Sequence, residues 1–204
     1  MRFYKDKVFW YVFTALALVK GAALAGVFYF HPLGDKILAF PDSLTYVYQA
    51  QTWLEYGQMW EAVTAAPMLL RTPGYPFFLA VVQTLFHNMT WAVVLVQNLL
   101  SLALLIPVYM TAEKLNGKHS ARAPALFCAA SVLYFSLSFA VLTEILCAFL
   151  LSWFVYFTVN FLLKPARHKL FLAALFLSSA VYVRPAAYYR SEEHTSELQS
   201  PMYL

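Results

Sequence analysis

Two acidic and two basic side chains lie at the edges of apolar segments, where they could meet a polar or charged molecule. They are Asp42, Glu144, Arg71 and Arg184. A guanidinium at the level of lipid headgroups is well suited to binding a lipid-linked phosphate, and a carboxylate at a helix start is favoured in its ionised form. Both groups also have a purely structural interpretation: Asp42 could be a helix N-cap, and Arg71 could be an interfacial anchor. What these groups can do depends on the segments that position them.

The composition identifies the chain as a membrane protein. Of its 204 residues, 62% are hydrophobic and only 12% are charged, whereas soluble domains carry about 25% charge. Several apolar runs approach the ~20 residues that cross a bilayer, and the first is too long for the apolar core of a signal peptide. The predicted fold class is an all-α, polytopic transmembrane helical bundle. Its helices are expected near 8–30, 91–111, 123–140, 145–163 and 170–183, with a short or re-entrant one at 76–87.

The last fifteen residues depart from this composition. Residues 190–200, RSEEHTSELQS, resemble the in-frame translation of a common sequencing-library adapter, so 190–204 is predicted to be an artefactual tail. Without its one arginine and three glutamates, the chain holds 13 basic and 7 acidic residues and a net charge of +6. The gene is accordingly expected to continue beyond Tyr189, which would make residues 1–189 a fragment.

The basic residues predict the orientation in the membrane. Nine of the thirteen form three clusters, which the positive-inside rule assigns to the cytoplasm together with the N-terminus. Residues 31–74 then form the first extracytoplasmic loop, and 142–144 form an outer turn. Charge counting makes 76–87 re-entrant or peripheral, whereas a tilted full crossing would reverse the later loops; both interpretations stay open. The clusters are Arg2, Lys5 and Lys7; Lys114, Lys118 and Arg122; and Lys164, Arg167 and Lys169.

The predicted outer loop contains an interfacial helix. The stretch PDSLTYVYQAQTWLEYG has a helix-start pattern at residues 41–43 and a stop at Gly57. Its aromatic-rich, weakly charged pattern is typical of a helix that lies in the interface. Tyr46 follows Asp42 by one turn on the same face. Glu144 lies in the outer turn, and Arg184 follows an odd number of crossings after the last basic cluster, so the charged candidates are expected to converge on the outer face.

Other polar positions carry weaker signals. Lys20 lies midway along the first apolar run, where a charge costs about 3 kcal/mol; a functional role, snorkelling and an interhelical partner are the alternatives. Cys128 and Cys147 lie in apolar runs and are interpreted as buried free thiols. The sequence shows no cluster of histidines and cysteines for a metal, no glycine-rich phosphate loop and no serine–histidine nucleophile pattern.

The combination of motifs resembles a known family. The outer loop opens with D-x-x-x-Y-x-x-x-A, at Asp42, Tyr46 and Ala50, and closes with R-x-P-G-Y-P, which begins at Arg71. This arrangement resembles the polytopic GT-C glycosyltransferases, and within them glycosyltransferase family 39, related to protein O-mannosyltransferases and aminoarabinose transferases. A Thr-Glu pair at the outer turn and a late Arg-Pro pair add to the resemblance, which covers residues 8–189. Ser43 departs from it, because many relatives carry a second acidic residue there.

The resemblance implies an activity and its partners. A sugar would pass from a polyprenyl-phosphate carrier in the bilayer to an acceptor at the outer face of the inner (plasma) membrane, with inversion at the anomeric carbon and no nucleic-acid partner. The relatives are two to three times longer, so the chain as given is expected to be inactive. Alternatives are a transporter or flippase-like protein and a non-catalytic scaffold. The roles implied are a base for Asp42, which could also hold a divalent ion (Mg or Mn); phosphate binding for Arg71 and Arg184; acceptor or metal orientation for Glu144 and Tyr46; and a structural motif for Pro73, Gly74, Tyr75 and Pro76.

Overall fold

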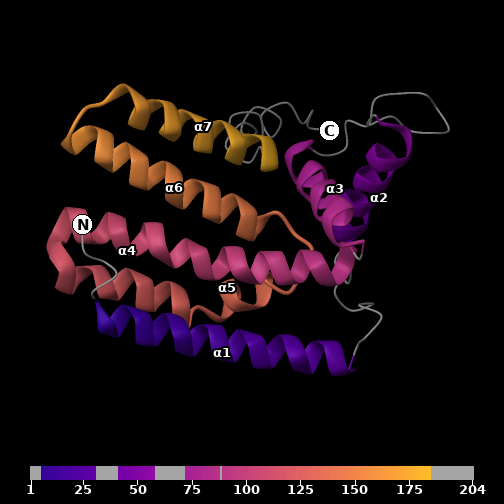
Figure 1. The fold of residues 1–204 in the computed structure, drawn as a ribbon, viewed down its shortest axis with the longest axis horizontal. Helices are drawn as coiled ribbons and strands as arrows, with labels where there is room; N and C mark the ends of the chain where they lie inside the picture. The colour runs from indigo at the N-terminus through magenta and orange to yellow at the C-terminus, as the bar shows by residue number, and fades with distance from the viewer. Residues whose placement is uncertain (1–5, 31–40, 58–71, 88, 185–204) are drawn as a thin grey trace, which may run out of the picture.

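The computed structural model describes residues 6–30, 41–57, 72–87 and 89–184. Within these ranges all regular structure is helical, and the helices form one bundle (Figure 1), which confirms the predicted all-α class. Arg2, Lys5, Arg71 and the predicted tail 190–204 lie outside the described residues. The helices are α1 (Lys7–Phe30), α2 (Pro41–Tyr56), α3 (Gly74–Phe86), α4 (Met89–Ala130), α5 (Val132–Leu137), α6 (Glu144–Leu163) and α7 (Arg167–Val183).

Four long helical segments lie side by side in the order α1, α4, α6, α7 (Figure 1). In the described part of the chain, three segments are long and apolar enough to cross a membrane, namely Lys7–Phe30, Trp91–Gly117 and Glu144–Leu163. α6 packs against both α4 and α7, and α1 packs against α4. The predicted transmembrane helical bundle is thereby confirmed.

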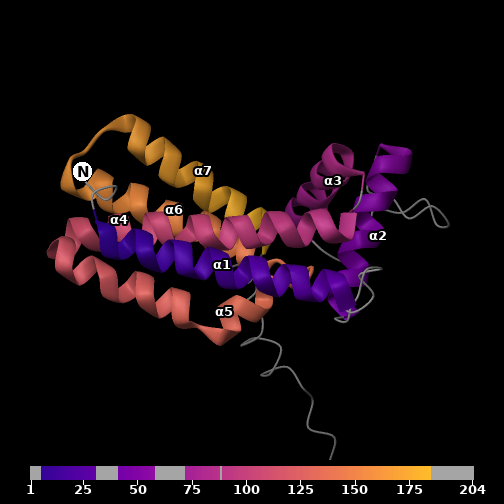
Figure 2. The ribbon, with the colours of Figure 1, turned by 60° about the horizontal axis from the view of Figure 1, so that its bottom comes forward.

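α4 consists of two arms that meet at Gly117, where the backbone is not helical. Gly117 has a φ of 79°, which residues with a side chain rarely adopt. The first arm runs the length of the bundle, and the second arm, residues 118–130, returns beside it (Figure 2). The cysteine of this second arm, Cys128, and Cys147 of α6 are both free, as predicted, but they are half-buried rather than buried.

The single helix predicted at 123–140 is wrong. The second arm of α4 ends at Ala130, α5 covers only six residues, and 138–143 are not helical. Ser131 has an extended backbone, and its hydroxyl accepts a hydrogen bond from the Tyr134 N–H at 3.3 Å, so it caps α5. A serine that caps a new helix competes with continuation of the old one, and an apolar pattern does not reveal this break.

α2 and α3 stand together at one end of the bundle, where α1 ends and α6 begins (Figures 1 and 2). α2 begins at Pro41 and is followed by Gly57, whose φ is 68°, so both of its predicted boundaries are confirmed. α3 has 13 residues and a length of about 20 Å, short of a ~30 Å hydrocarbon core. It packs against α2, α4 and α7, which favours the interpretation of this segment as peripheral.

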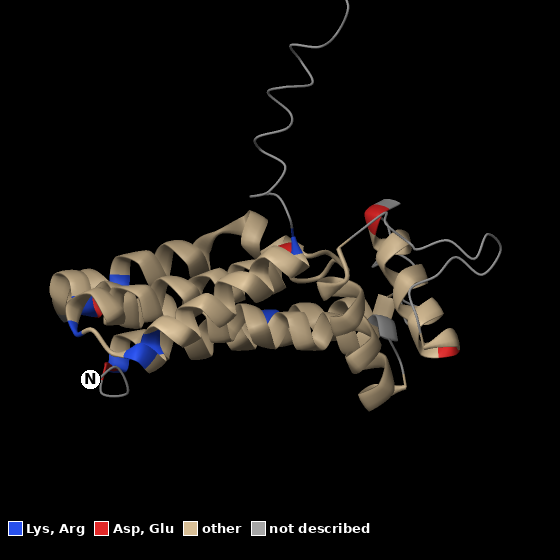
Figure 3. Cartoon of the chain, turned by 90° about the horizontal axis from the view of Figure 1, so that it is seen from above, with Lys and Arg blue, Asp and Glu red and all other residues tan. Residues whose placement is uncertain are grey.

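The opposite end of the bundle is basic. Figure 3 shows lysine and arginine gathered there, where α1 begins, α4 turns and α6 joins α7. The described members of all three predicted clusters therefore share one end, although they come from distant parts of the sequence. They include Lys7, Lys114, Arg122, Lys164, Arg167 and Lys169.

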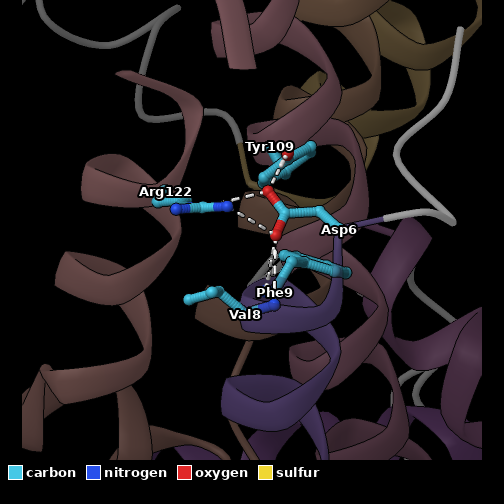
Figure 4. A network of polar contacts seen from close by, with 5 residues as sticks. All are labelled: Asp6, Val8, Phe9, Tyr109 and Arg122. Atoms are coloured by element: carbon cyan, nitrogen blue, oxygen red, sulfur yellow. Dashed lines mark hydrogen bonds and ion pairs between the residues drawn. The ribbon is translucent and has the colours of Figure 1, made fainter. Parts of the chain in front are cut away.

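A buried carboxylate, Asp6, connects helices at this basic end (Figure 4). Asp6 is 1% exposed, and Arg122 donates to its two oxygens over 3.0 Å each. The Tyr109 hydroxyl donates to the same carboxylate at 2.6 Å, and the Val8 N–H donates at 3.0 Å. The hydrogen bond from Arg122 is the main reason that the pKa of Asp6 lies well below its usual value. This network fastens the start of α1 to both arms of α4.

Candidate functional site

An ion pair joins two residues that are forty positions apart at the α2–α3 end. Glu144 is the first residue of α6, and Arg184 directly follows α7. Because the two helices are antiparallel neighbours, the start of one meets the end of the other. The Arg184 Nη1 donates to the Glu144 Oε1 at 3.0 Å, and the two side chains are 45% and 28% exposed. A charged pair is thus held in place while both members stay open to other molecules.

Asp42 lies in the first turn of α2 and is exposed. Its carboxylate is at the helix end where the macrodipole favours negative charge. The next residue, Ser43, is buried, and its hydroxyl donates to the Val141 carbonyl at 2.9 Å. Val141 is three residues before Glu144, so one hydrogen bond connects the segments that carry the two carboxylates. It also gives a reason for the serine, since an acidic side chain there would face a carbonyl oxygen.

Tyr46 lies in the packed layer of α2 and not on the open surface. It is 8% exposed, and its ring meets that of Tyr75 edge-on, with centroids 5.0 Å apart. Tyr75 is fully buried. Its pKa is raised first by this burial and then by the nearby Tyr46 and Glu144. The two tyrosines are therefore buried side chains near the exposed ion pair. The expected orienting role of Tyr46 stays a prediction.

The P-G-Y-P motif docks α3 onto the end of α7. A Cβ on Gly74 would lie 2.6 Å from the carbonyl carbon and oxygen of Tyr182, so only glycine permits this approach. The Thr72 hydroxyl donates to the Val183 carbonyl at 3.2 Å. Pro73 precedes α3, and Pro76 falls in its first turn, where its missing N–H costs no helix hydrogen bond. The motif therefore fixes the backbone directly next to Arg184.

A mostly apolar groove opens beside this contact. It has a volume of about 430 Å³ and lies between α2, α3 and α7. Trp53, Phe77 and Tyr182 supply aromatic walls, and Ser178 and Ser179 add hydroxyl groups. The groove shares Gly74 and Val183 with the docking contact, so it ends close to the Arg184 position.

The described residues do not fit a metal site of protein ligands alone. No group of three or more histidine, cysteine, aspartate and glutamate side chains comes together in the described part of the chain. Among the described carboxylates at this end, Glu144 already accepts a hydrogen bond from Arg184, whose positive charge opposes a cation. No step is assigned to a divalent ion, and the expected Mg or Mn ion stays a prediction.

Buried amides near the site were missed from the sequence. Gln97 and Asn98 of α4 are at most 2% exposed, and Gln97 donates to the Leu142 carbonyl at 2.8 Å, two residues before Glu144. The signal was present, because two adjacent amides interrupt the apolar run at 91–111. The carbonyls that these amides bind lie about forty residues away. The sequence around positions 97 and 98 could not predict them.

The family comparison covers most of this site. The model of the dolichyl-phosphate-mannose-protein mannosyltransferase family matches residues 70–190. This range contains Arg71, the P-G-Y-P motif, Glu144 and Arg184, whereas Asp42 and Tyr46 precede it. No curated protein and no solved structure matches the chain significantly.

The helical bundle with membrane-length helices is consistent with a GT-C membrane glycosyltransferase, the class that the family match supports. The chain belongs to the dolichyl-phosphate-mannose-protein mannosyltransferase family, which is one of the GT-C families. Its class is thus a transferase, in preference to the transporter and scaffold alternatives.

Proposed function

We propose that the protein transfers a sugar from a polyprenyl-phosphate carrier to an acceptor hydroxyl at the outer face of the cytoplasmic (inner) membrane. The observation that carries this proposal is the exposed ion pair of Arg184 and Glu144, held at the same end of the bundle as Asp42. A fixed guanidinium at a membrane edge offers a binding site for the phosphate of a carrier that arrives within the bilayer.

The orientation follows from charge. Lysine and arginine gather at the end opposite α2 and α3 (Figure 3), and the positive-inside rule places such an end in the cytoplasm. The N-terminus then lies in the cytoplasm, and Asp42, Glu144 and Arg184 lie outside. An outer site suits a donor that is delivered on a lipid, because the carrier headgroup reaches the surface without leaving the membrane.

The reaction needs a base on one side of the sugar and a phosphate binder on the other. Asp42 accepts the proton of the acceptor hydroxyl as its oxygen forms the new bond to the anomeric carbon. The bond from that carbon to the phosphate oxygen breaks, and the electron pair leaves with the carrier phosphate. Arg184, together with Arg71 as the family resemblance implies, neutralises the charge that develops there. Attack opposite the leaving group inverts the anomeric carbon.

Glu144 and the groove complete the site. Glu144 holds the Arg184 side chain toward the open surface, and its carboxylate leaves that guanidinium with further donors for a phosphate. The apolar groove lined by Trp53, Phe77 and Tyr182 offers a surface for the first isoprenoid units of the carrier. The acceptor hydroxyl approaches from the Asp42 side.

Replacing the proposed base tests this function. In membranes that contain the full-length protein, Asp42→Asn is expected to lower sugar transfer from a panel of polyprenyl-phosphate sugars by about 10²–10⁴-fold, the range for loss of a general base. Membrane insertion and abundance should be unchanged. Glu55→Gln is the matched control, because Glu55 is an exposed carboxylate near the other end of α2, and it should retain full transfer. Transfer that survives Asp42→Asn would overturn the role of Asp42.

Labelling tests the orientation separately. A cysteine at position 55 in a protein without Cys128 and Cys147 should react with a membrane-impermeant maleimide added to intact cells. If the reagent reaches it only after the membrane is opened, α2 faces the cytosol and the outer-face proposal is wrong.

A further inference from the structure

The segment 138–143, which leads into Glu144, is buried although it is not helical. Ser138, Val141 and Thr143 are between 0% and 4% exposed. Inside a membrane bundle, irregular backbone persists only where protein groups satisfy its N–H and C=O groups. The conformation of this segment therefore depends on its partners from other helices.

Three side chains from α2 and α4 bind the carbonyls of this segment. Asn98 donates to the Ser138 carbonyl at 2.9 Å, and Gln97 donates to the Leu142 carbonyl at 2.8 Å. The third, Ser43, binds the Val141 carbonyl, as described above. Three of the six carbonyls in the segment thus receive side-chain donors from other helices, at its first residue and at two residues near its end.

Lys20 supplies the remaining contact, from α1. Its side chain is 1% exposed, and its ammonium donates to the Ser138 hydroxyl at 2.6 Å and to the Asn98 amide oxygen at 3.2 Å. It also lies 4.6 Å from the centre of the Phe135 ring. Among the described residues no carboxylate pairs with it. Its charge is therefore stabilised by the two groups that also hold the start of the segment, and it does not snorkel to a surface.

We propose that Lys20 is a positioning residue for the outer site: it locks Ser138 and Asn98, and through them the buried segment 138–143 that sets the place of Glu144. Lys20 touches neither substrate nor the ion pair. It acts on Glu144 through the six residues of backbone 138–143. Removing the Lys20 ammonium should therefore displace the start of α6, and it does not remove a group that reacts. The claim that this segment affects sugar transfer rests on the proposed function. The claim that Lys20 holds the segment in place does not.

Cysteine labelling tests the step that is independent of activity. In purified protein with Cys128 and Cys147 replaced by serine, Thr143→Cys reports on the segment and Ala121→Cys reports on the opposite end, since both positions are buried. Lys20→Met should raise the maleimide reaction rate at position 143 about tenfold, the factor expected for loss of a hydrogen bond to a charged group. The rate at position 121 should stay within twofold.

Two further variants keep the test decisive. Ser138→Ala removes the hydroxyl acceptor without deleting a charge, and it should raise labelling at position 143 in the same direction even where Lys20→Met is poorly produced. Lys114→Met is the matched control, because Lys114 also binds an asparagine, Asn160, but lies at the basic end; it should leave position 143 unchanged. Unchanged labelling at 143 in both Lys20→Met and Ser138→Ala, or an equal rise at 121, would overturn the proposal.

Kinetics test the link to the site. With the native cysteines restored, Lys20→Met should lower kcat for sugar transfer about tenfold and change the KM for the donor less than twofold, because Lys20 does not contact the donor. A normal kcat together with raised labelling at position 143 would overturn the positioning role. If the full-length wild-type protein shows no transfer at all, the proposed function fails, and the labelling results still decide whether Lys20 controls the segment.

Discussion

The two ends of the bundle each carry an arginine–carboxylate pair, and the two pairs differ in how they are enclosed. At the basic end, the Asp6 side chain is fully buried under Arg122 and receives further donors. At the other end, the side chains of Glu144 and Arg184 are 28% and 45% exposed. The oxygens of Asp6 are occupied by hydrogen bonds from other protein groups. In the second pair, part of the Arg184 guanidinium and of the Glu144 carboxylate remains exposed and can bind another molecule. Exposure, more than residue type, separates the structural pair from the candidate site.

The difference has a physical cause in the connections that surround each pair. Asp6 lies where α1 begins beside both arms of α4, so three segments enclose it. Glu144 and Arg184 lie at the ends of two antiparallel helices, next to the docked α3, and among the described residues they stay partly exposed. Burial makes the loss of one partner costly for stability, whereas a partly exposed pair contributes little to stability.

The largest effect on stability is expected at the closed pair. Asp6→Asn leaves Arg122 and Tyr109 without their shared acceptor and should destabilise the protein by about 3 kcal/mol. That corresponds to a fall in Tm on the order of 10 °C, measured by thermal unfolding in detergent. A Tm within 2 °C of the wild type would show that the closed pair does not hold this end together.

The pH dependence sharpens this prediction. Because the pKa of Asp6 is lowered in the folded protein from an ordinary value of 3.8, its contribution is present above about pH 4 and is lost as the pH falls toward the folded value. The Tm difference between wild type and Asp6→Asn should therefore narrow as the pH falls below 4.

At the open pair the expected effect is on activity. Arg184→Gln should lower sugar transfer about 10²-fold, because it removes the charge that we propose stabilises the leaving phosphate. Its Tm should remain within ~4 °C of the wild type, since an exposed pair contributes at most about 1 kcal/mol. A large fall in Tm with normal transfer in the protein that remains would reverse the assignment of the two ends.

The docking contact at Gly74 should give an intermediate change. Gly74→Ala forces a Cβ against the Tyr182 backbone and should cost about 1–3 kcal/mol through overpacking. Gly26→Ala is the matched control in α1, where nothing lies within 4 Å of the added Cβ, and it should be neutral or slightly stabilising. Equal stability of the two variants would contradict the close approach of α3 and α7.

The smallest effect is expected for the other member of the open pair. Glu144→Gln should change the free energy of unfolding by less than about 1 kcal/mol and should lower transfer less than Arg184→Gln does. Thermal unfolding and transfer assays on the same preparations measure both quantities. A stability loss as large as that of Asp6→Asn would mean that the two pairs are equivalent.

Local patterns predicted the elements whose boundaries are local. Both ends of α2 follow from the residues that form them, a helix-start pattern at 41–43 and a glycine with positive φ at its end. The break at Ser131 and the buried segment 138–143 escaped prediction because the run from 123 to 140 is almost uniformly apolar. The hydrogen-bond partners of Ser138 in this segment are Lys20 and Asn98, which lie 118 and 40 positions away in the sequence.

Gly74 makes the same point at the site. In the sequence it belongs to a turn-like motif between two prolines, but its φ is not positive, so no turn requires it. Glycine is needed there because α7 passes too close for a side chain. That contact joins residues more than a hundred positions apart, and no pattern around position 74 contains it.

The sequence alone determined that the chain is a helical membrane protein, because it has few charges and its apolar runs approach the length of a membrane-spanning helix, which satisfies its own backbone hydrogen bonds. It also located the charged candidates, since ionised groups other than Lys20 lie at or near the ends of the apolar runs. Only the tertiary structure decided which of these charges meet, because pairing depends on which helices pack as neighbours and in which direction. It likewise decided that one arginine–carboxylate pair is sealed and the other open, because burial is a property of the surrounding segments and not of the residues themselves.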